Sequence, residues 1–503
     1  MNDDDEANRQ VRRVNVHRVL GLWSIRRALT SAFVTAVILL IAAWFFISWL
    51  LGSPPKASPK PLDTTAQLEL LKLVFALVAG VGALVALVTA YRRQRVDEAA
   101  AERAERAQAH TEQVARDNAY DASQRRVTEL YGQAVEQLGH DKAAVRLGGL
   151  YSLERLGQDH PQHRQTIVDV VCSYLRMPFQ SPRLASSNTQ SSSRENNFTG
   201  DIRQEIQVRL AAQRLLARRL SLPVDQDAVA TDAHWSGIRV DLAGAQLIDF
   251  DFSLCRTTEA IFSNVDFSGN ARFDGARFDG RVKFDEAKFD GPASFSESRF
   301  IGDACFDGVN FDGDSWFHGA RFDRYANFEK TQFGGAARCN RAKFKLTARF
   351  DRSHFKGDAW FDWVQFGDGA SFERAQLRGD ARFNGAHFKG SSNFGRSARF
   401  SESNFYGDAY FDSAHFEGDA GFAGAHFGGL AGFVRAKFKE GAGFVGTRFD
   451  GTALFTDSQF DQEPNFVNAS VRHSTRMHVW PRPWHVHTAT NEAAKLVRQG
   501  ADA

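Results

Sequence analysis

The sequence contains few cysteines, and their spacing excludes the sites that cysteines usually build. The chain of 503 residues has four, none of them in a C-x-x-C pair: Cys172, Cys255, Cys305 and Cys339. This scatter argues against a disulfide scaffold and against a cysteine-based zinc site, and it suits a reducing compartment.

Charge of one sign and the common catalytic motifs are lacking as well. Lys and Arg total 62 against 60 Asp and Glu, a formal net charge of +2, whereas a charge-driven nucleic-acid binder is far more basic. The sequence has no G-x-x-x-x-G-K-[ST], H-E-x-x-H or G-x-S-x-G motif. We therefore predict no enzyme activity, no catalytic residue, no cofactor and no small-molecule substrate.

Four histidines gather near the C-terminus, at His473, His478, His485 and His487. Imidazole suits several metals, but no cysteine or tight set of carboxylates accompanies them. A capping loop is the interpretation we favour, so no metal site is predicted. The many Asp residues in GDA and DG turns are interpreted as corner residues, because the G-G-x-G-x-D nonapeptide of calcium-binding β-rolls is missing.

Two long uncharged runs stand near the start of the chain, Leu29–Leu51 and Leu73–Ala90. At 1.5 Å per residue each is long enough to cross a ~30 Å hydrocarbon core. We predict a transmembrane helical hairpin with spans at 29–51 and 68–91, joined by a Pro-rich external loop at 52–67. A buried pair of core helices and a signal peptide are the less favoured alternatives.

Basic residues predict the orientation of this hairpin. Six Arg precede the first span and three follow the second, while the loop between them has only two Lys. The positive-inside rule then places both termini in the cytoplasm. We therefore predict a multi-pass protein of the inner (plasma) membrane, with the lipid bilayer as one partner and a basic cytoplasmic tail at 1–28.

The segment that follows the second span has helical patterns. Ala-, Glu- and Arg-rich residues at 92–126 predict a solvated helical stalk. Apolar residues at helical spacing predict a small helical subdomain at 127–178, with one helix closing near Gly157. A Ser-rich linker at 179–200 and a basic capping helix at 201–220 follow.

Phenylalanine is in large excess, with 44 copies against 8 Tyr and 3 Met. From Phe262 to Phe466, 38 positions recur at alternating spacings of five and six, and only Cys339 and Leu377 among them are not Phe. A small or β-branched residue stands two positions before each. The series extends backward at five-residue spacing through Phe252, Leu247 and Leu242. The spacing departs from the alternation once, at the step from Phe394 to Phe400, which has six residues where five are expected.

This spacing predicts a solenoid of short strands. Side chains two residues apart share one face of a strand, so each unit buries one small and one Phe-sized side chain and then turns a polar corner. Two units of five and two of six predict a four-sided coil of about 22 residues. At a strand spacing of ~4.8 Å the coils form a rod of ~45 Å.

The repeat resembles the pentapeptide repeat family, whose pattern is A-(D/N)-L-x-x, over residues 237–470. Phe replaces Leu at the centre, and every second unit has a sixth residue. The segment EQLGHDKAAVRLGGLYSLERLGQDHP resembles the juxtamembrane segment of actinobacterial membrane-bound pentapeptide repeat proteins. These resemblances imply an α+β chain, in which a transmembrane helical hairpin and a helical subdomain precede a right-handed quadrilateral β-helix, and they imply no known activity.

A 22-residue coil places equivalent residues in columns. We predict a core stack of Phe273, Phe295, Phe317, Phe361 and Phe383. On one outer face we predict an Arg/Trp ladder with cation–π contacts, made of Trp316, Arg338, Trp360 and Arg382 and widened by Trp363 and Tyr325. The ladder either stiffens the rod or forms a partner-binding stripe, since Trp and Arg are typical interface anchors.

Solenoid ends need polar caps. The basic helix at 201–220 is the candidate at one end. At the other end we predict a C-terminal cap and tail at 471–503, with Trp480, Pro481, Pro483 and Trp484 as the capping residues.

These features predict a non-enzymatic scaffold, anchored in the membrane, whose rod binds an unidentified protein partner; homo-oligomerisation is left open and no nucleic acid is expected. One alternative is a DNA mimic acting on a topoisomerase, as some pentapeptide repeat proteins act on gyrase. Residues 261–470 hold 29 acidic and 26 basic side chains, however, and mimicry needs a dense acidic face. The other alternative is a sensor or enzyme that works through the helical subdomain.

Overall fold

The computed structural model describes residues 25–50, 64–179, 193–222, 234–390, 398–474, 476–487 and 494–499. It divides into two compact units, Met1–Ser123 and Gln124–Ala503. Most of the predicted cytoplasmic tail, external loop and Ser-rich linker lies outside the described residues.

Helices make up the described part of the first unit. They are α2 (Ile25–Leu50) and α3 (Thr64–Leu138), which continues into the second unit. In its polar part, pairs four residues apart support the helix: Arg106 lies 3.1 Å from Glu102, and Arg116 lies 3.5 Å from Glu112. The stalk continues the helix of the predicted second span, and the first subdomain helix belongs to the same helix.

Apolar side chains cover α2 and the first part of α3. Among the described helices, α3 is the one long and apolar enough to cross a membrane by length and composition, and none of its apolar window is buried. The apolar run of α2, Phe33–Phe46, is shorter. Phe33 and Leu87 are each 71% exposed, so both helices present apolar surface that other described residues do not cover.

Helices also open the second unit. After the end of α3 come α4 (Ala143–Asp159), the 3₁₀ turn η2 (Pro161–His163), α5 (Arg164–Arg176) and α6 (Ser193–Leu220). Gly149 lets α4 approach α3, because a Cβ there would lie 2.7 Å from the Ala134 carbonyl oxygen. The helix predicted to close near Gly157 ends two residues later, at Asp159; Gly157 lies in its last turn, where a Cβ would lie 2.5 Å from the Trp235 ring. α6 begins inside the segment predicted as linker.

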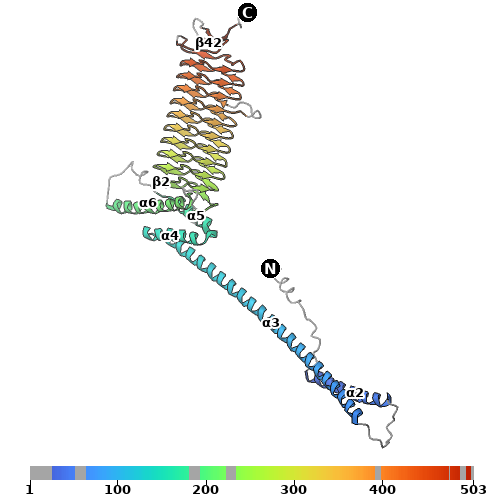
Figure 1. Ribbon diagram of the computed structural model, residues 1–503. Coiled ribbons are helices and arrows are strands. Elements are labelled where there is room, and N and C mark those ends of the chain that lie inside the picture. Colours follow the sequence, from blue (N-terminus) through green and yellow to red (C-terminus); the bar gives the residue numbers. More distant parts are fainter. Residues whose placement is uncertain are drawn as a thin grey trace, which may run out of the picture. The chain divides into compact units, whose positions relative to one another are not determined.

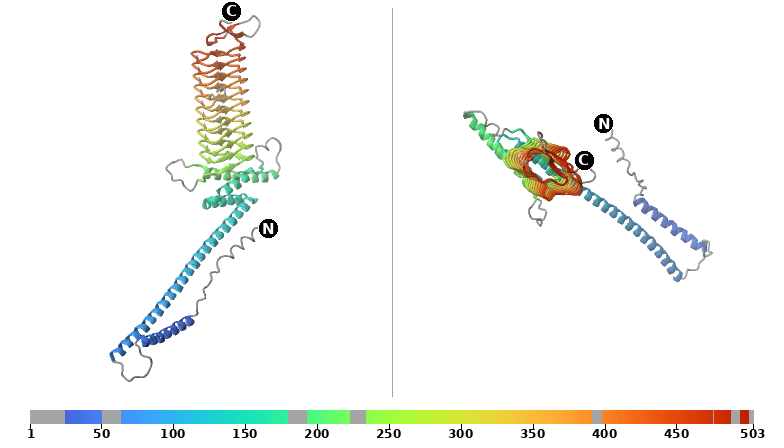
Figure 2. Two further views of the ribbon diagram at one scale, coloured as in Figure 1. Left: turned by 90° about the vertical axis from the view of Figure 1, so that its right-hand side faces the viewer. Right: turned by 90° about the horizontal axis from the view of Figure 1, so that it is seen from above.

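From Arg239 the chain winds as a solenoid (Figure 1). Its short strands form four sheets in which the successive coils pair in parallel. We number the sheets I to IV in winding order, so that the chain passes from I to II, III and IV and back to I. Seen along the solenoid, the coils superimpose (Figure 2).

Most strands contain two residues. Sheet I contains β1 (Arg239–Asp241), β4 (Glu259–Ile261), β8 (Val282–Lys283), β12 (Ala304–Cys305), β16 (Ala326–Asn327), β20 (Ala348–Arg349), β24 (Ala370–Ser371), β28 (Ala398–Arg399), β32 (Ala420–Gly421) and β36 (Ala442–Gly443). Sheet II contains β2 (Gln246–Ile248), β5 (Asp266–Ser268), β9 (Lys288–Phe289), β13 (Asn310–Phe311), β17 (Gln332–Phe333), β21 (His354–Phe355), β25 (Gln376–Leu377), β29 (Asn404–Phe405), β33 (His426–Phe427), β37 (Arg448–Phe449), β40 (Ser470–Val471), β42 (Ala494–Arg498) and β41 (Trp484–His487).

The other two sheets carry the candidate site. Sheet III contains β6 (Ala271–Arg272), β10 (Ala293–Ser294), β14 (Ser315–Trp316), β18 (Ala337–Arg338), β22 (Ala359–Trp360), β26 (Ala381–Arg382), β30 (Ala409–Tyr410), β34 (Ala431–Gly432) and β38 (Ala453–Leu454). Sheet IV contains β3 (Arg256–Thr257), β7 (Arg277–Phe278), β11 (Arg299–Phe300), β15 (Arg321–Phe322), β19 (Lys343–Phe344), β23 (Gln365–Phe366), β27 (His387–Phe388), β31 (His415–Phe416), β35 (Lys437–Phe438) and β39 (Gln459–Phe460).

The pairing register gives the coil length. In the first coil Arg239 pairs with Glu259, which is the step that four five-residue units produce. In later coils the step has the predicted length, since Ala304 pairs with Ala326. The predicted alternation of five and six residues therefore produces four faces per coil once the repeat is established.

The register corrects the repeat at two places. Ala370 pairs with Ala398, so this coil contains a six-residue insertion rather than a one-residue slip. Phe394, counted as a central residue, lies outside the described residues. The periodic series also omitted Thr257, which is buried and pairs with Phe278 in the central position.

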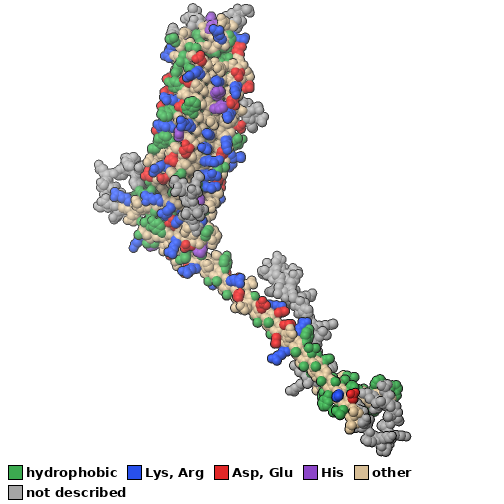
Figure 3. All heavy atoms as spheres, viewed as in Figure 1, with side chains coloured by type: hydrophobic (Ala, Val, Ile, Leu, Met, Phe, Trp, Pro, Cys, Tyr) green, Lys and Arg blue, Asp and Glu red, His purple; other side chains and the backbone are tan. Residues whose placement is uncertain are grey.

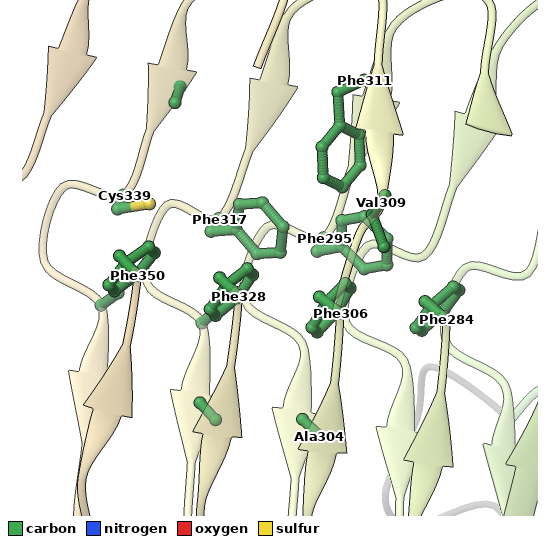
Figure 4. Close-up of a cluster of buried hydrophobic side chains, with 14 of the residues drawn as sticks. Phe284, Phe295, Ala304, Phe306, Val309, Phe311, Phe317, Phe328, Cys339 and Phe350 are labelled. Carbon is green, nitrogen blue, oxygen red and sulfur yellow. The ribbon is translucent and has the colours of Figure 1, made fainter. Parts of the chain in front are cut away.

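Aromatic rings fill the interior in columns. Phe273 stacks on Phe295 with 4.8 Å between ring centroids, and Phe361 stacks on Phe383 at 5.0 Å. Rings of sheets I and III meet edge to face, as Phe284 and Phe295 do at 5.4 Å and 88°; both arrangements are favourable for aromatic pairs. Figure 4 shows the row Phe284, Phe306, Phe328 and Phe350 beside the row Phe295, Phe317 and Cys339. Cys339 supplies no ring, so the predicted core stack is interrupted there.

Two glutamines close the first coil. The Gln213 side-chain amide, on α6, donates to the Ile248 carbonyl at 2.8 Å and accepts from the Ile248 N–H at 3.1 Å. Gln165, on α5, makes the same pair of bonds with Arg239, both at 2.9 Å. Each side chain replaces a missing strand at a sheet edge that would otherwise be unpaired. The capping role predicted for 201–220 is therefore shared with α5.

Charged side chains join the helices of this cap to one another. Arg209 is buried and donates to the carbonyls of Leu175 at 2.9 Å and Met177 at 2.7 Å. Glu154 on α4 lies 2.7 Å from both Arg218 and Arg219 of α6. The predicted helical subdomain and α6 thus form a single cap.

Indole rings cover the other end. Trp480 lies 5.2 Å from Phe449, 5.6 Å from Phe455 and 5.7 Å from Phe466, between ring centroids. Trp484 lies 5.6 Å from Phe466. β42 pairs antiparallel with β40 and β41. The two tryptophans predicted as capping residues therefore lie on the last rings of the core.

Candidate interaction surface

Along each strand of sheet III, one side chain points into the core and the next points to the outer face. In β18, for example, Ala337 is buried and Arg338 is half-buried on the outside. The register places Trp316 opposite Arg338, Arg338 opposite Trp360, and Trp360 opposite Arg382. The four residues predicted from the 22-residue coil therefore lie in one column, which we call the Trp/Arg ladder.

Cation–π contacts link the four residues of the ladder. The Arg338 guanidinium carbon lies 5.4 Å from the Trp316 ring centroid and 5.0 Å from that of Trp360, and Arg382 lies 5.5 Å from Trp360. These distances are within the ~6 Å range of the interaction. Asp314 lies 2.6 Å from Arg338, and this hydrogen bond lowers the pKa of the Asp314 carboxyl. Arg338 therefore lies between two indole rings and is bonded to a carboxylate.

Aspartates at the corner before sheet III tie successive coils together. Asp358 Oδ1 accepts from the Asp380 N–H at 3.0 Å, and Asp380 Oδ1 accepts from the Asp408 N–H at 3.1 Å. Asp408 Oδ1 then accepts from the Leu430 N–H at 2.8 Å. Carboxylate acceptors make strong bonds to backbone amides, so these aspartates act as the corner residues that the sequence predicted.

Two aromatic residues that were expected to widen the ladder lie on different corners. Trp363 follows sheet III directly, with φ +58° and 63% of its surface exposed. Tyr325 directly precedes β16 of sheet I. Sheet IV lies between this corner and the corner after sheet III. Tyr325 therefore does not extend the ladder.

Sheet IV carries a second outward column, which the sequence analysis overlooked. The first residue of each strand points outward, and none of the ten is Asp or Glu. We call these residues the basic column: Arg256, Arg277, Arg299, Arg321, Lys343, Gln365, His387, His415, Lys437 and Gln459. The 22-residue spacing that predicted the ladder would have found this column had it been applied to the next face. Figure 3 shows Lys and Arg interspersed with acidic side chains on the face in view.

Burial keeps three of the cysteine thiols protonated. Burial raises the pKa of the Cys172 thiol to about 12, and it raises those of Cys255 and Cys339 too; such thiols are protonated near neutral pH and are poor nucleophiles. In the described ranges no three His, Cys, Asp or Glu side chains are placed to hold a metal. His478 accepts from the Ala453 N–H at 3.2 Å and so belongs to the cap.

Comparisons with known proteins identify the repeat. A family profile described as pentapeptide repeats (9 copies) matches residues 242–288, 284–332, 295–343, 340–387 and 390–437. No curated protein and no solved structure matches the chain. All of the profile matches fall within the four-sheet solenoid. The solenoid of this chain therefore belongs to the pentapeptide repeat family.

Proposed function

We propose that this chain is a non-enzymatic, membrane-anchored protein whose solenoid presents a rigid surface to a protein partner at the cytoplasmic face of the inner membrane. The observation that carries the proposal is the Trp/Arg ladder. It places two indoles and two guanidinium groups in one column, and Trp and Arg are the residues most enriched at interface hot spots.

Rigidity favours binding at this surface. Asp314 and two rings fix Arg338, and the backbone beneath is paired on both sides in sheet III. A side chain that is already ordered loses less conformational entropy when a partner binds. The ladder therefore supports binding and stiffening together, and the two interpretations left open by the sequence are compatible.

We infer that the four sheets form a right-handed quadrilateral coil. Parallel strands joined by crossovers within one sheet are right-handed in about 98% of cases, because a right-twisted strand packs back only in that sense. The handedness determines on which side of the ladder sheet IV lies.

We propose that α2 and α3 anchor the solenoid in the membrane as a two-span hairpin. Apolar side chains of both helices are exposed, among them Trp49 and Phe75, and a bilayer would remove them from water. The Arg residues that flank both runs favour cytoplasmic termini. Protease treatment of intact cells carrying a C-terminal tag tests the orientation: we expect protection until lysis, and digestion of the tag in intact cells would contradict it.

The DNA-mimic alternative finds no support in the surface charges. Neither the Trp/Arg ladder nor the basic column contains a carboxylate, whereas a mimic of DNA needs a continuous acidic face. The sensor alternative is not favoured either, because polar residues of the helical cap are already used in structural bonds. Gln165 and Gln213 bond to the first coil, and Arg209 bonds to the carbonyl of Leu175 within the cap.

Site-specific photo-crosslinking tests the interaction surface. A photoreactive amino acid replaces Trp360 in the full chain in its native membrane, and a matched variant carries it at Gln376, on the outer face of sheet II. We expect discrete cross-linked species from position 360 and none from position 376. The same species from both positions, or none from 360, would contradict the proposal.

A further inference from the structure

A cavity of about 490 Å³ opens at the corner between sheets III and IV. Its lining comes from three successive coils: Arg341, Lys343, Trp363, Gln365, Gly385 and His387. Lys343, Gln365 and His387 are neighbours in the basic column, while the other three residues occupy one corner column. The cavity thus lies beside the Trp/Arg ladder, and its lining contains no carboxylate.

Backbone conformation at the corner shapes this cavity. Arg341, Trp363 and Gly385 have φ values of +59°, +58° and +61°, a region that side chains rarely adopt. A Cβ on residue 385 would lie 2.6 Å from Trp363 Cε3. The glycine therefore leaves room for the indole to lie against the next coil, where its ring forms an apolar wall.

The two permanently charged residues of the lining, Arg341 and Lys343, are not compensated by neighbouring carboxylates. The nearest acidic side chains bind elsewhere: Asp323 pairs with Arg299 at 3.0 Å and with Lys345. Glu417 pairs at 2.7 Å with His387, the third basic residue of the lining. Within the part of the chain that the structure describes, no ion pair within 4.0 Å joins Arg341 or Lys343 to a carboxylate.

We propose that this cavity binds a carboxylate side chain within an acidic, extended segment of a protein partner. The inference rests on the proposed protein-interaction function and names the chemistry of the partner. Arg341 suits a carboxylate because its guanidinium fork makes two parallel hydrogen bonds, and Lys343 adds a point charge. The Trp363 ring packs against an apolar neighbour in the segment, and the Gln365 amide bonds to its backbone.

The basic column continues the site along the solenoid. Successive strands of sheet IV lie at the ~4.8 Å spacing of paired strands, so Arg321 and Lys343, which are neighbours in the column, face a segment one strand spacing apart. A protein segment fits better than a nucleic acid. Nucleic-acid binders neutralise about 6–10 phosphates, and most other cations of the column have acidic partners, as Arg256 and Arg277 have in Asp279.

Peptide binding to the purified full chain in detergent tests the proposal. The probe is fluorescein-labelled decaglutamate, with binding followed by anisotropy at low salt. The double variant Arg341→Glu/Lys343→Glu should weaken binding at least about tenfold, because exposed charges attract the probe only at short range. The control Lys283→Glu/Lys288→Glu makes the same charge change on sheets I and II and should stay within about twofold.

A second variant, which leaves the net charge unchanged, distinguishes specific binding in the cavity from non-specific electrostatic attraction of the probe. Trp363→Gly places at this corner the residue that already stands at the equivalent position 385, so the fold is retained, and we expect weaker binding of a probe with one central Phe. Ser413→Gly, in the same corner column and also without a charge change, is its control and should bind normally. Equal losses in sites and controls, or no binding to the wild-type chain, would overturn the inference.

Competition identifies the class of partner. A 20-nucleotide single strand of DNA, inorganic phosphate and phosphatidylserine vesicles should each displace decaglutamate only at concentrations far above that of unlabelled decaglutamate. Stronger displacement by DNA or vesicles would overturn the assignment to an acidic protein segment. Photo-crosslinking at position 360 does not depend on the cavity. If decaglutamate does not bind there, the cross-linking experiment therefore still tests the proposed function separately.

Discussion

Phe361 contacts aromatic rings from two columns of the core. It stacks on Phe383 at 5.0 Å and meets Phe350 and Phe372 edge to face, both at 5.3 Å. Phe361→Ala should therefore destabilise the solenoid by about 3–5 kcal/mol through lost burial and a residual cavity. The unfolding midpoint, followed by the β-sheet circular dichroism signal, measures this. Trp363→Gly is the exposed control, and an equal loss from both variants would contradict the assigned register.

Cys339 interrupts one ring column and offers a stabilising change. Phe317 and Phe361 lie one coil to either side of it, and Cys339 is buried between them. Cys339→Phe should raise the melting temperature, because it adds a ring at the spacing at which the rest of the column stacks. Cys305→Ser, at an outward position of sheet I, should change it little. A lower melting temperature for Cys339→Phe would mean that neighbouring rings have closed the space.

Asp450 makes part of the stability depend on pH. Burial raises the pKa of its carboxyl, but hydrogen bonds from Arg448 and His426 outweigh burial and lower the pKa to about 2. Because the folded pKa lies below the unfolded value of about 3.9, the stabilisation is complete above pH 4 and is lost as the pH falls toward 2. Asp450→Asn should cost about 2 kcal/mol at pH 7, and the difference from wild type should shrink between pH 4 and 2. A pH-independent difference would contradict the pKa assignment.

At the scale of elements, Gln213 replaces a strand. Its side chain is 4% exposed and makes both backbone bonds of Ile248. Gln213→Ala would leave the N–H and the carbonyl of the half-buried Ile248 without these bonds, at about 1 kcal/mol each. Hydrogen exchange should accelerate in β2 and β5 and remain slow in coils far from the cap. Gln207→Ala, exposed on the same helix, is the control; unchanged exchange in β2 would show that water replaces the amide.

Elements that depend on local periodicity were predictable from the sequence, and those that depend on distant contacts were not. The coil length, the buried Phe positions and the ladder follow from a spacing that repeats once in every regular coil. The Gln213–Ile248 and Gln165–Arg239 pairs join residues 35 and 74 positions apart, and one glutamine on a helix carries no pattern that indicates its partner.

The candidate site was predictable in part for the same reason. Trp316, Arg338, Trp360 and Arg382 stand out by residue type, so their column was noticed. The cavity beside Trp363 also depends on the missing side chain of Gly385, on the left-handed corner and on the placement of Lys343 in the next column. The cavity is formed by two neighbouring columns in three successive coils. An interpretation that follows one column at a time does not bring these residues together.

At the scale of the whole molecule, the solenoid depends on its two caps. Each coil contacts mainly its neighbours, so stability accumulates along the stack and the terminal coils lack half of their contacts. Helices α5 and α6 bond to the first coil through Gln165 and Gln213, and Trp480 covers the last coil through ring contacts. Removal of the second cap would therefore uncover aromatic rings of the core.

A chain that ends after residue 474 would expose the rings of Phe449, Phe455 and Phe466 and would free the edge strand β40. Exposed apolar ends and unpaired strands both promote association. We expect this variant to form end-to-end dimers in detergent, with a dimer fraction that rises with protein concentration. Size-exclusion chromatography with light scattering measures the mass. Trp480→Ser should do so more weakly, because β42 still covers β40. A truncated chain that elutes at the same mass as the full chain at every concentration would show that the last coil needs no cap.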